Sequence, residues 1–199
     1  KSFVSKRFAA ALGYVQIETL FLFEDMTARD LLQRRSTNSR GESIWEATPL
    51  SHAVKRGGLC VLDGLHRLSA GTISALSRLI QDREVTLYDG TRFISPRRYE
   101  YLTKVMNVSV NELTLRNVHP VHPSFRILGL GIPTSRRGKT WLSNEVMQLF
   151  HFFSLPRMTK FYDVVSKTVP NCPPTIIVKL VNVRENLLAA ANDSSSPLW

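Results

Sequence analysis

The stretch Leu59–Arg67 (LCVLDGLHR) carries residues whose types and spacing could do chemistry. Its apolar run leads directly into Asp63, which is followed by Gly64. Such a run is typical of a buried parallel strand that ends at the carboxyl edge of a sheet, where open α/β folds bind ligands. A carboxylate there can hold a Mg²⁺ ion bound to nucleotide phosphates. A plain turn after a buried strand is the alternative, because Asp-Gly is a common turn pair.

Helical and strand patterns alternate around this stretch. Apolar spacing predicts helices over residues 1–12, 49–56, 69–81, 95–106 and 142–149, and a short helix that ends at Leu32. Apolar or β-rich runs predict strands over residues 15–23, 59–62, 125–130 and 151–155. The alternation predicts an α/β fold in three layers, with a parallel sheet covered by helices on both faces.

Other segments are expected to connect or extend this core. Residues 84–94 predict a β-hairpin with Asp89-Gly90 at its turn, and residues 119–123 predict an extended linker because proline biases the preceding residue away from helix. Residues 36–43 and 134–140 predict loops, the second of them basic. Two helices over 159–169 and 175–191 predict a partial helical lid at 156–192 after a core at 1–155. Residues 193–199 predict a disordered tail.

The composition narrows the possible functions. The chain has 199 residues, of which 43% are hydrophobic, so a packed core is expected and wholesale disorder is not. No apolar run approaches the roughly 20 residues of a membrane span. The net charge of +10 is compatible with nucleic acid, an anionic surface or phosphate ligands, but the basic residues are scattered in pairs. The two cysteines and five histidines form no metal-ligand spacing.

Taken in order, these parts resemble an AAA+ ATPase module of the dynein-related, MoxR-like kind, a P-loop NTPase fold. The resemblance is carried by Asp25–Arg35 (DMTARDLLQRR), Leu50–Val54 (LSHAV), Leu62–Thr72 (LDGLHRLSAGT), Arg78–Phe93 (RLIQDREVTLYDGTRF) and His122–Leu130 (HPSFRILGL). In this family Lys1-Ser2, at the start of the first helix, would be the end of the phosphate-binding loop G-x-x-x-x-G-K-[ST]. The chain is therefore expected to begin inside that loop and to lack the central strand before it.

The resemblance implies ATP and Mg²⁺ as cofactors and assigns roles to three residues. Lys1 would contact the β- and γ-phosphates of ATP. Ser2 would place its hydroxyl on Mg²⁺, and Asp63 would hold the same ion through water. A helix N-terminus favours an anion in any case, and a lysine adds a full positive charge.

The sequence also departs from the family pattern. Gly64 stands where the family has a glutamate that orients the attacking water, and a glutamate restored there is expected to raise hydrolysis. The polar sensor expected near Leu130–Ile132 and the arginine finger expected near Met147–Leu149 are both missing. Weak or absent turnover is therefore expected. The stand-in candidates are His66 and Arg67, beside the aspartate, and Arg136 and Arg137, on the basic loop.

The sequence is compatible with three functions. The first is an ATP-binding, ATP-hydrolysing module of a large remodelling ATPase, whose partners are neighbouring AAA+ modules in a ring or in the same chain. The second is a structural module of such a ring that binds no nucleotide. The third is a basic nucleic-acid-binding domain, which ranks lower because no aromatic stacking platform or reading helix is visible. The resemblance further implies a mitochondrial location. The sequence itself predicts no direct nucleic acid partner and no membrane span.

Overall fold

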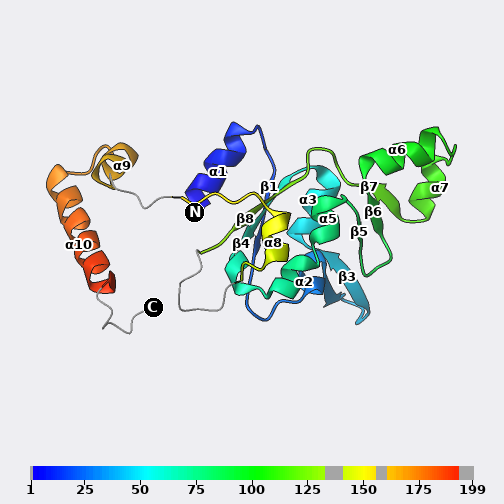
Figure 1. Cartoon of the computed structure of the whole chain (residues 1–199), viewed down its shortest axis with the longest axis horizontal. Helices are drawn as coiled ribbons and strands as arrows, with labels where there is room; N and C mark the ends of the chain where they lie inside the picture. The colour runs from blue at the N-terminus through cyan, green and yellow to red at the C-terminus, as the bar shows by residue number, and fades with distance from the viewer. Residues whose placement is uncertain (1, 133–140, 156–160, 193–199) are drawn as a thin grey trace. The chain divides into compact units, whose positions relative to one another are not determined.

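A three-stranded parallel sheet is the centre of the first part of the chain. The structure, a computed structural model, describes residues 2–132, 141–155 and 161–192. The sheet joins β1 (Ile17–Phe21), β4 (Leu59–Asp63) and β8 (Arg126–Leu130) in the order β1-β4-β8 (Figure 1). In this register Asp63 lies between Phe21 of β1 and Leu130 of β8. The expected strand with an acid at its carboxyl end is therefore present.

The central strand β4 is buried on both faces. Cys60 and Leu62 pack into the larger hydrophobic cluster, which includes Ile73, Leu76 and Leu79. Leu59 and Val61 face the other way and pack against Ala9 of the first helix. Alternate side chains of one strand thus serve two separate cores, which explains the continuous apolar run. The expected α/β fold with helices on both faces is confirmed.

Eight helices and one 3₁₀ turn are described in this part of the chain. They are α1 (Ser2–Ala11), α2 (Ala28–Leu32), α3 (Pro49–Arg56), η1 (Leu65–Arg67), α4 (Ala70–Ser74), α5 (Ser77–Gln81), α6 (Pro96–Lys104), α7 (Val110–Leu115) and α8 (Asn144–Leu149).

Capping residues define the amino ends of α2 and α3. The Asp30 carboxylate accepts hydrogen bonds from the N–H and hydroxyl of Thr27, and these bonds lower the pKa of Asp30. Thr48 caps α3, with Pro49 in its first turn.

Two expected elements are corrected by the structure. The helix predicted over residues 69–81 is broken into α4 and α5, because Ile73, Leu76 and Leu79 are all buried at a spacing of three residues. A tighter turn, in which the N–H of Leu76 donates to the carbonyl of Ile73, keeps all three on one side. The strand predicted over residues 151–155 does not form, and the side chain of Phe153 is 88% exposed, so this run has no buried face.

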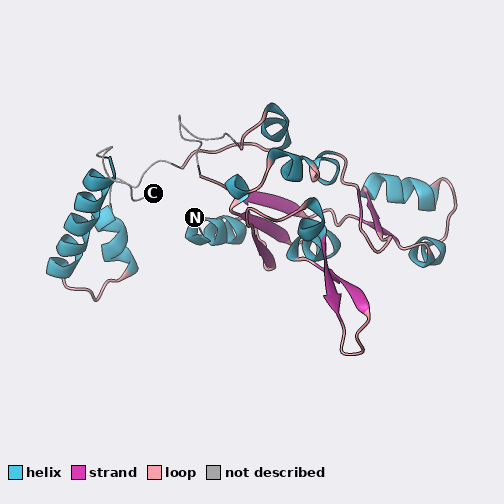
Figure 2. Ribbon diagram, turned by 90° about the horizontal axis from the view of Figure 1, so that it is seen from below, coloured by secondary structure: helices cyan, strands magenta, loops and turns pink. Residues whose placement is uncertain are grey.

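Two β-hairpins extend from this core, and hydrogen bonds and a ring stack join them. The first joins β2 (Gln33–Thr37) and β3 (Ser43–Ala47), so the polar loop predicted over residues 36–43 is shorter than expected (Figure 2). The predicted hairpin joins β5 (Val85–Thr86) and β6 (Arg92–Ile94), and the expected linker adds a parallel strand, β7 (Val118–Pro120). The buried side chain of Gln33 accepts hydrogen bonds from the N–H groups of Tyr88 and Asp89, and Trp45 stacks on Tyr88.

Gln33→Ala is expected to lower the free energy of unfolding by about 1–3 kcal/mol, because it leaves two backbone N–H groups without their acceptor. Denaturant unfolding followed by circular dichroism measures the change. Gln148→Ala, on the exposed side of α8, is the matched control and is expected to be nearly neutral. Equal stability of the two variants would mean that Gln33 does not fasten the hairpins.

The chain divides into two compact units, Lys1–Phe152 and Phe153–Trp199. In the second, α9 (Phe161–Thr168) packs against α10 (Pro174–Asn192), with Ile177 buried and the guanidinium of Arg184 4.9 Å from the ring centre of Phe161. No helix in the described part of the chain, α10 included, is long and apolar enough to cross a membrane. The assignment of residues 156–192 as a lid stays a prediction, and the expected disordered tail lies outside the described residues.

Candidate functional site

Asp63 is the last residue of the central strand, and its side chain is partly exposed at the carboxyl edge of the sheet. Its backbone is held firmly, because its carbonyl accepts a 2.8 Å hydrogen bond from the N–H of Leu22. Its carboxylate makes no hydrogen bond or ion pair with any residue that the structure describes. A carboxylate on a rigid strand end without a protein partner is available to a cation or to a water bound to one.

The first helix is directed towards the same edge. A short connection joins the carboxyl end of α1 to the amino end of β1, and Ala9 packs on Leu59 and Val61 of the sheet face. The amino end of α1 therefore points towards the carboxyl ends of the strands (Figure 1), and a helix amino end favours an anion. Ser2 is the first residue of α1, and Lys1 lies outside the described residues.

Gly64, at the position where the resemblance implies a glutamate, has a backbone conformation that favours glycine. It is buried, with φ of +99°, and its N–H donates to the carbonyl of Leu130 at 3.0 Å. A Cβ atom at this position would lie 3.1 Å from the carbonyl oxygen of Leu22. Residues with side chains rarely adopt this conformation, so the expectation that Gly64→Glu raises hydrolysis is revised. The residue that follows Asp63 is held in a conformation suited to glycine.

Of the expected stand-ins near Asp63, Arg67 lies directly beside Gly64. Its side chain is exposed, its Nη1 donates to the carbonyl of Leu22 at 3.3 Å, and its Cδ would lie 3.4 Å from a Cβ built on Gly64. His66 is half-buried on the same 3₁₀ turn. The Arg67 side chain thus lies next to position 64, where the family has a glutamate. Arg136 and Arg137 lie outside the described residues.

Trp141 is a residue that sequence reasoning missed at this edge. Its indole Nε1 donates to the carbonyl of Ile132 at 3.0 Å, and a Cβ atom on Gly131 would lie 2.7 Å from its ring. The indole therefore packs on the segment Leu130–Ile132, where the polar sensor was expected. Gly129 and Gly131 at the end of this strand could have indicated the contact from the sequence, because a glycine in a strand often marks the close approach of another group.

The arginine-finger segment, Cys60 and the metal-ligand side chains form no second catalytic or metal site among the described residues. The segment expected to hold an arginine finger lies in α8, where Met147 is exposed, Leu149 is buried and no residue is basic. Burial raises the pKa of the Cys60 thiol to about 12, so it is an unreactive core group. Among the described residues, no three His, Cys, Asp or Glu side chains gather as a metal-binding group. A Mg²⁺ ion at Asp63 would need the nucleotide phosphates, water or Ser2 for its other ligands.

The parallel β1-β4-β8 sheet with its helices is consistent with the fold of an AAA-type ATPase core. The profile of the AAA domain, dynein-related subfamily, matches residues 1–150. The chain therefore belongs to the dynein-related subfamily of AAA domains. Membership supports an ATP-binding, ATPase-type function at the level of the family.

Two curated relatives agree with this assignment. The chain is 40% identical over 202 residues to von Willebrand factor A domain-containing protein 8 of Mus musculus, covering 100% of this chain but 11% of that protein. It is 32% identical over 83 residues to protein NorQ of Paracoccus denitrificans, covering 42% of this chain and 30% of that protein. The chain thus spans only a small part of the mouse protein. A crystal structure of a candidate ATPase from Cytophaga hutchinsonii covers 78% of this chain and 38% of its own, with 18% identity and a TM-score of 0.47.

Proposed function

We propose that this chain binds ATP with Mg²⁺ at the carboxyl edge of the β1-β4-β8 sheet and hydrolyses it slowly or not at all. The observation that carries the proposal is the Asp63 carboxylate, which ends the central strand and has no protein partner among the described residues. Lys1, and Ser2 as the first residue of α1, are proposed to hold the phosphates and the ion. Bound Mg²⁺ would neutralise phosphate charge, and the chain would orient the nucleotide.

Slow turnover is supported by three features of the edge. Gly64 supplies no side chain to orient water, and its backbone conformation disfavours one. The place of the polar sensor holds apolar residues covered by Trp141, whose indole Nε1 donates to the backbone carbonyl of Ile132. The segment Met147–Leu149 has no arginine. Loss of a finger alone typically lowers the rate of related NTPases by about 10³- to 10⁵-fold.

The test uses Trp141 as a reporter. The chain has three tryptophans, so Trp45→Phe with Trp199→Phe leaves Trp141 alone at the edge. The chain is extended at its amino end with the residues that precede the matched region in the mouse relative. ATP with Mg²⁺ is expected to change Trp141 emission saturably, and Lys1→Ala is expected to remove the response because it removes the phosphate-binding cation.

A variant that keeps Trp45 and has Trp141→Phe with Trp199→Phe controls for quenching by the nucleotide itself, and its emission should not respond. No saturable change in the Trp141 reporter would favour the second function, a structural module that binds no nucleotide. That function is favoured by the Gly64 conformation and the apolar sensor segment.

In either function, we propose that the partners are neighbouring AAA+ modules, in a ring or in the same chain. Crosslinking in cell lysate, followed by mass spectrometry, tests this. A mitochondrial location is proposed from the resemblance alone, and organelle fractionation tests it.

A further inference from the structure

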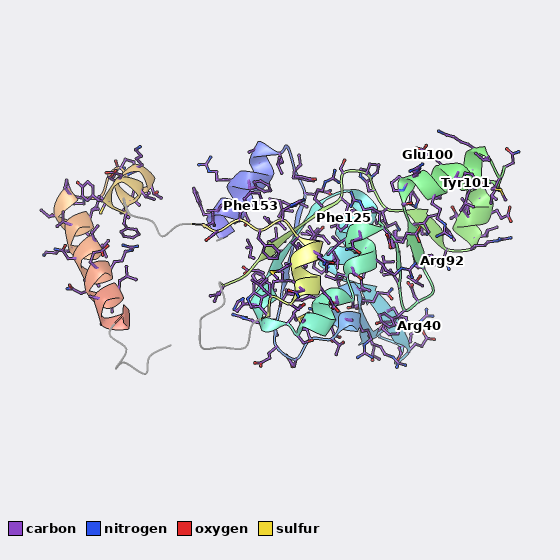
Figure 3. All side chains as sticks on the ribbon, viewed as in Figure 1. Arg40, Arg92, Glu100, Tyr101, Phe125 and Phe153 are labelled. Carbon is purple, nitrogen blue, oxygen red and sulfur yellow. The ribbon has the colours of Figure 1, made fainter. Side chains whose placement is uncertain are left out.

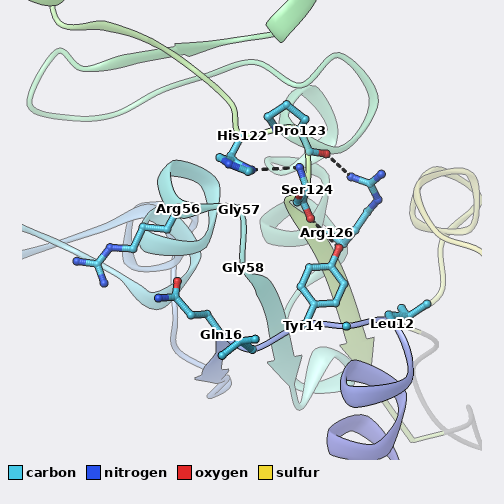
Figure 4. A pocket seen from close by; sticks show the side chains of 12 residues that line it. Leu12, Tyr14, Gln16, Arg56, Gly57, Gly58, His122, Pro123, Ser124 and Arg126 are labelled. Carbon is cyan, nitrogen blue, oxygen red and sulfur yellow. Dashed lines mark hydrogen bonds between the residues drawn. The ribbon is translucent and has the colours of Figure 1, made fainter.

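A pocket of about 520 Å³ opens at the amino edge of the same sheet, opposite the edge that holds Asp63 (Figure 4). The connection Leu12–Gln16, the end of α3 and the start of β8 form its walls. Because β4 has five residues, roughly 16 Å of strand separates the two edges. The pocket is therefore distinct from the proposed nucleotide site.

Hydrogen bonds hold the wall of the pocket in place. The Tyr14 hydroxyl donates to the carbonyl of Ser124 at 2.6 Å, which ties the α1–β1 connection to the start of β8. The N–H of Ser124 donates to Nδ1 of His122 at 3.2 Å, and the His122 ring packs so closely on Gly57 that a Cβ atom there would lie 2.1 Å from Nδ1. Figure 4 shows these contacts around the opening.

The charge of the pocket is one-sided. Arg56 and Arg126 both line it, and no carboxylate is among the described residues that do. The Arg56 guanidinium makes no hydrogen bond or ion pair with any described residue. Arg126 donates from Nη1 to the carbonyls of Pro123 and Phe125, which leaves its other N–H groups for a ligand. Burial, and secondarily the nearby charge of Arg126, lower the pKa of Arg83, whose Nη1 donates to the carbonyl of Phe125 just before β8.

We propose that this amino-edge pocket binds the phosphate group of a small phosphorylated molecule. Arginine forks, a serine hydroxyl and an imidazole N–H are donors that phosphate oxygens accept. A bound dianion would also offset the repulsion between Arg83 and Arg126. The volume lies within the range of about 300–1,000 Å³ that small-molecule sites occupy. Gly57 and Gly58 form the wall next to Arg56.

The experiment is a titration of the ¹⁵N-labelled 199-residue chain with inorganic phosphate at constant ionic strength, followed by amide chemical shifts. The amides of Gly57, Gly58 and Ser124 are expected to shift saturably. Arg56→Gln is expected to weaken binding about fivefold to tenfold, and Ser124→Ala to weaken it less, because one removes a charged donor and the other a neutral one. Both side chains are exposed, so the variants should fold, and the spectra report this directly.

Arg40→Gln is the matched control for net charge. Arg40 lies in the loop of the β2–β3 hairpin, well apart from Phe125, the neighbour of Arg126 (Figure 3). Wild-type affinity in Arg40→Gln and in Asp63→Asn supports the proposal and separates it from the nucleotide site. Equal weakening by Arg40→Gln, an equal response to acetate, or shifts confined to residues near Ser2 and Asp63 would each overturn it. Loss of binding in the amino-terminally extended chain would show that a protein segment, and not a phosphate, fills the pocket.

Discussion

Asp63→Asn is expected to weaken the binding of ATP with Mg²⁺ by about 10- to 100-fold and to leave the binding of Mg²⁺-free ATP nearly unchanged. The substitution keeps the size of the side chain but removes the charge that would hold the ion through water, and outer partners of metal ions typically contribute this much. The fold should not suffer, because the carboxylate has no hydrogen bond or ion pair among the described residues. Titration with and without Mg²⁺ measures both affinities in the amino-terminally extended chain.

Asp82→Asn is the matched control for this prediction. Asp82 follows α5 and is exposed, and its carboxylate likewise makes no hydrogen bond or ion pair with a described residue. Its replacement changes the net charge by the same amount and should leave both affinities at wild-type values. Equal losses in the two variants would trace the effect to overall charge and remove Asp63 from the site.

Gly64→Glu is expected to lower the free energy of unfolding by about 1–3 kcal/mol and to leave ATP hydrolysis no faster than in the wild type. A residue with a side chain in the left-handed region costs about this much. The contact of 3.1 Å between the new Cβ atom and the carbonyl of Leu22 adds to the cost. Thermal unfolding and a phosphate-release assay measure the two effects. An increase in hydrolysis would show that the backbone adapts and that the missing carboxylate alone limits turnover.

Alanine variants separate the two causes of this destabilisation. Gly90 also has positive φ, +87°, but a Cβ atom there would meet nothing within 4 Å. Gly90→Ala therefore measures the cost of backbone conformation alone, and Gly64→Ala measures that cost together with the contact with Leu22. We expect Gly64→Ala to be the less stable of the two. Equal stabilities would mean that the Leu22 carbonyl moves away freely.

Much of the core could be predicted because its signals are local. The run Leu59–Leu62 is apolar throughout since both of its faces are buried, and this pattern alone located the central strand. The helices predicted from residues 49 and 95 begin within one residue of the observed starts of α3 and α6, where Thr48 and Ser95 cap them. The roles of Lys1 and Ser2, in contrast, came from the resemblance to the AAA+ family and not from a local sequence pattern.

The features that could not be predicted depend on tertiary contacts. The break between α4 and α5 follows from three buried residues that must all face one core. Gln33 reads as an ordinary polar residue, yet it is buried because it holds two N–H groups of a hairpin 55 residues away. The left-handed backbone of Gly64 and the position of Trp141 are set by Leu22, Leu130 and Gly131. The contacts of Gln33 and Gly64 join segments distant in sequence, so no local pattern predicts them, and Gly129 and Gly131 indicate a close approach at the strand end without identifying Trp141.

The most direct test of the nucleotide site is calorimetric titration of the amino-terminally extended wild-type chain with ATP, first with Mg²⁺ and then with EDTA. We predict one nucleotide bound per chain, with clearly higher affinity when Mg²⁺ is present, because the ion would link the phosphates to Asp63. A folded extended chain that binds no ATP in the presence of Mg²⁺ would contradict the proposal that this edge is a nucleotide site.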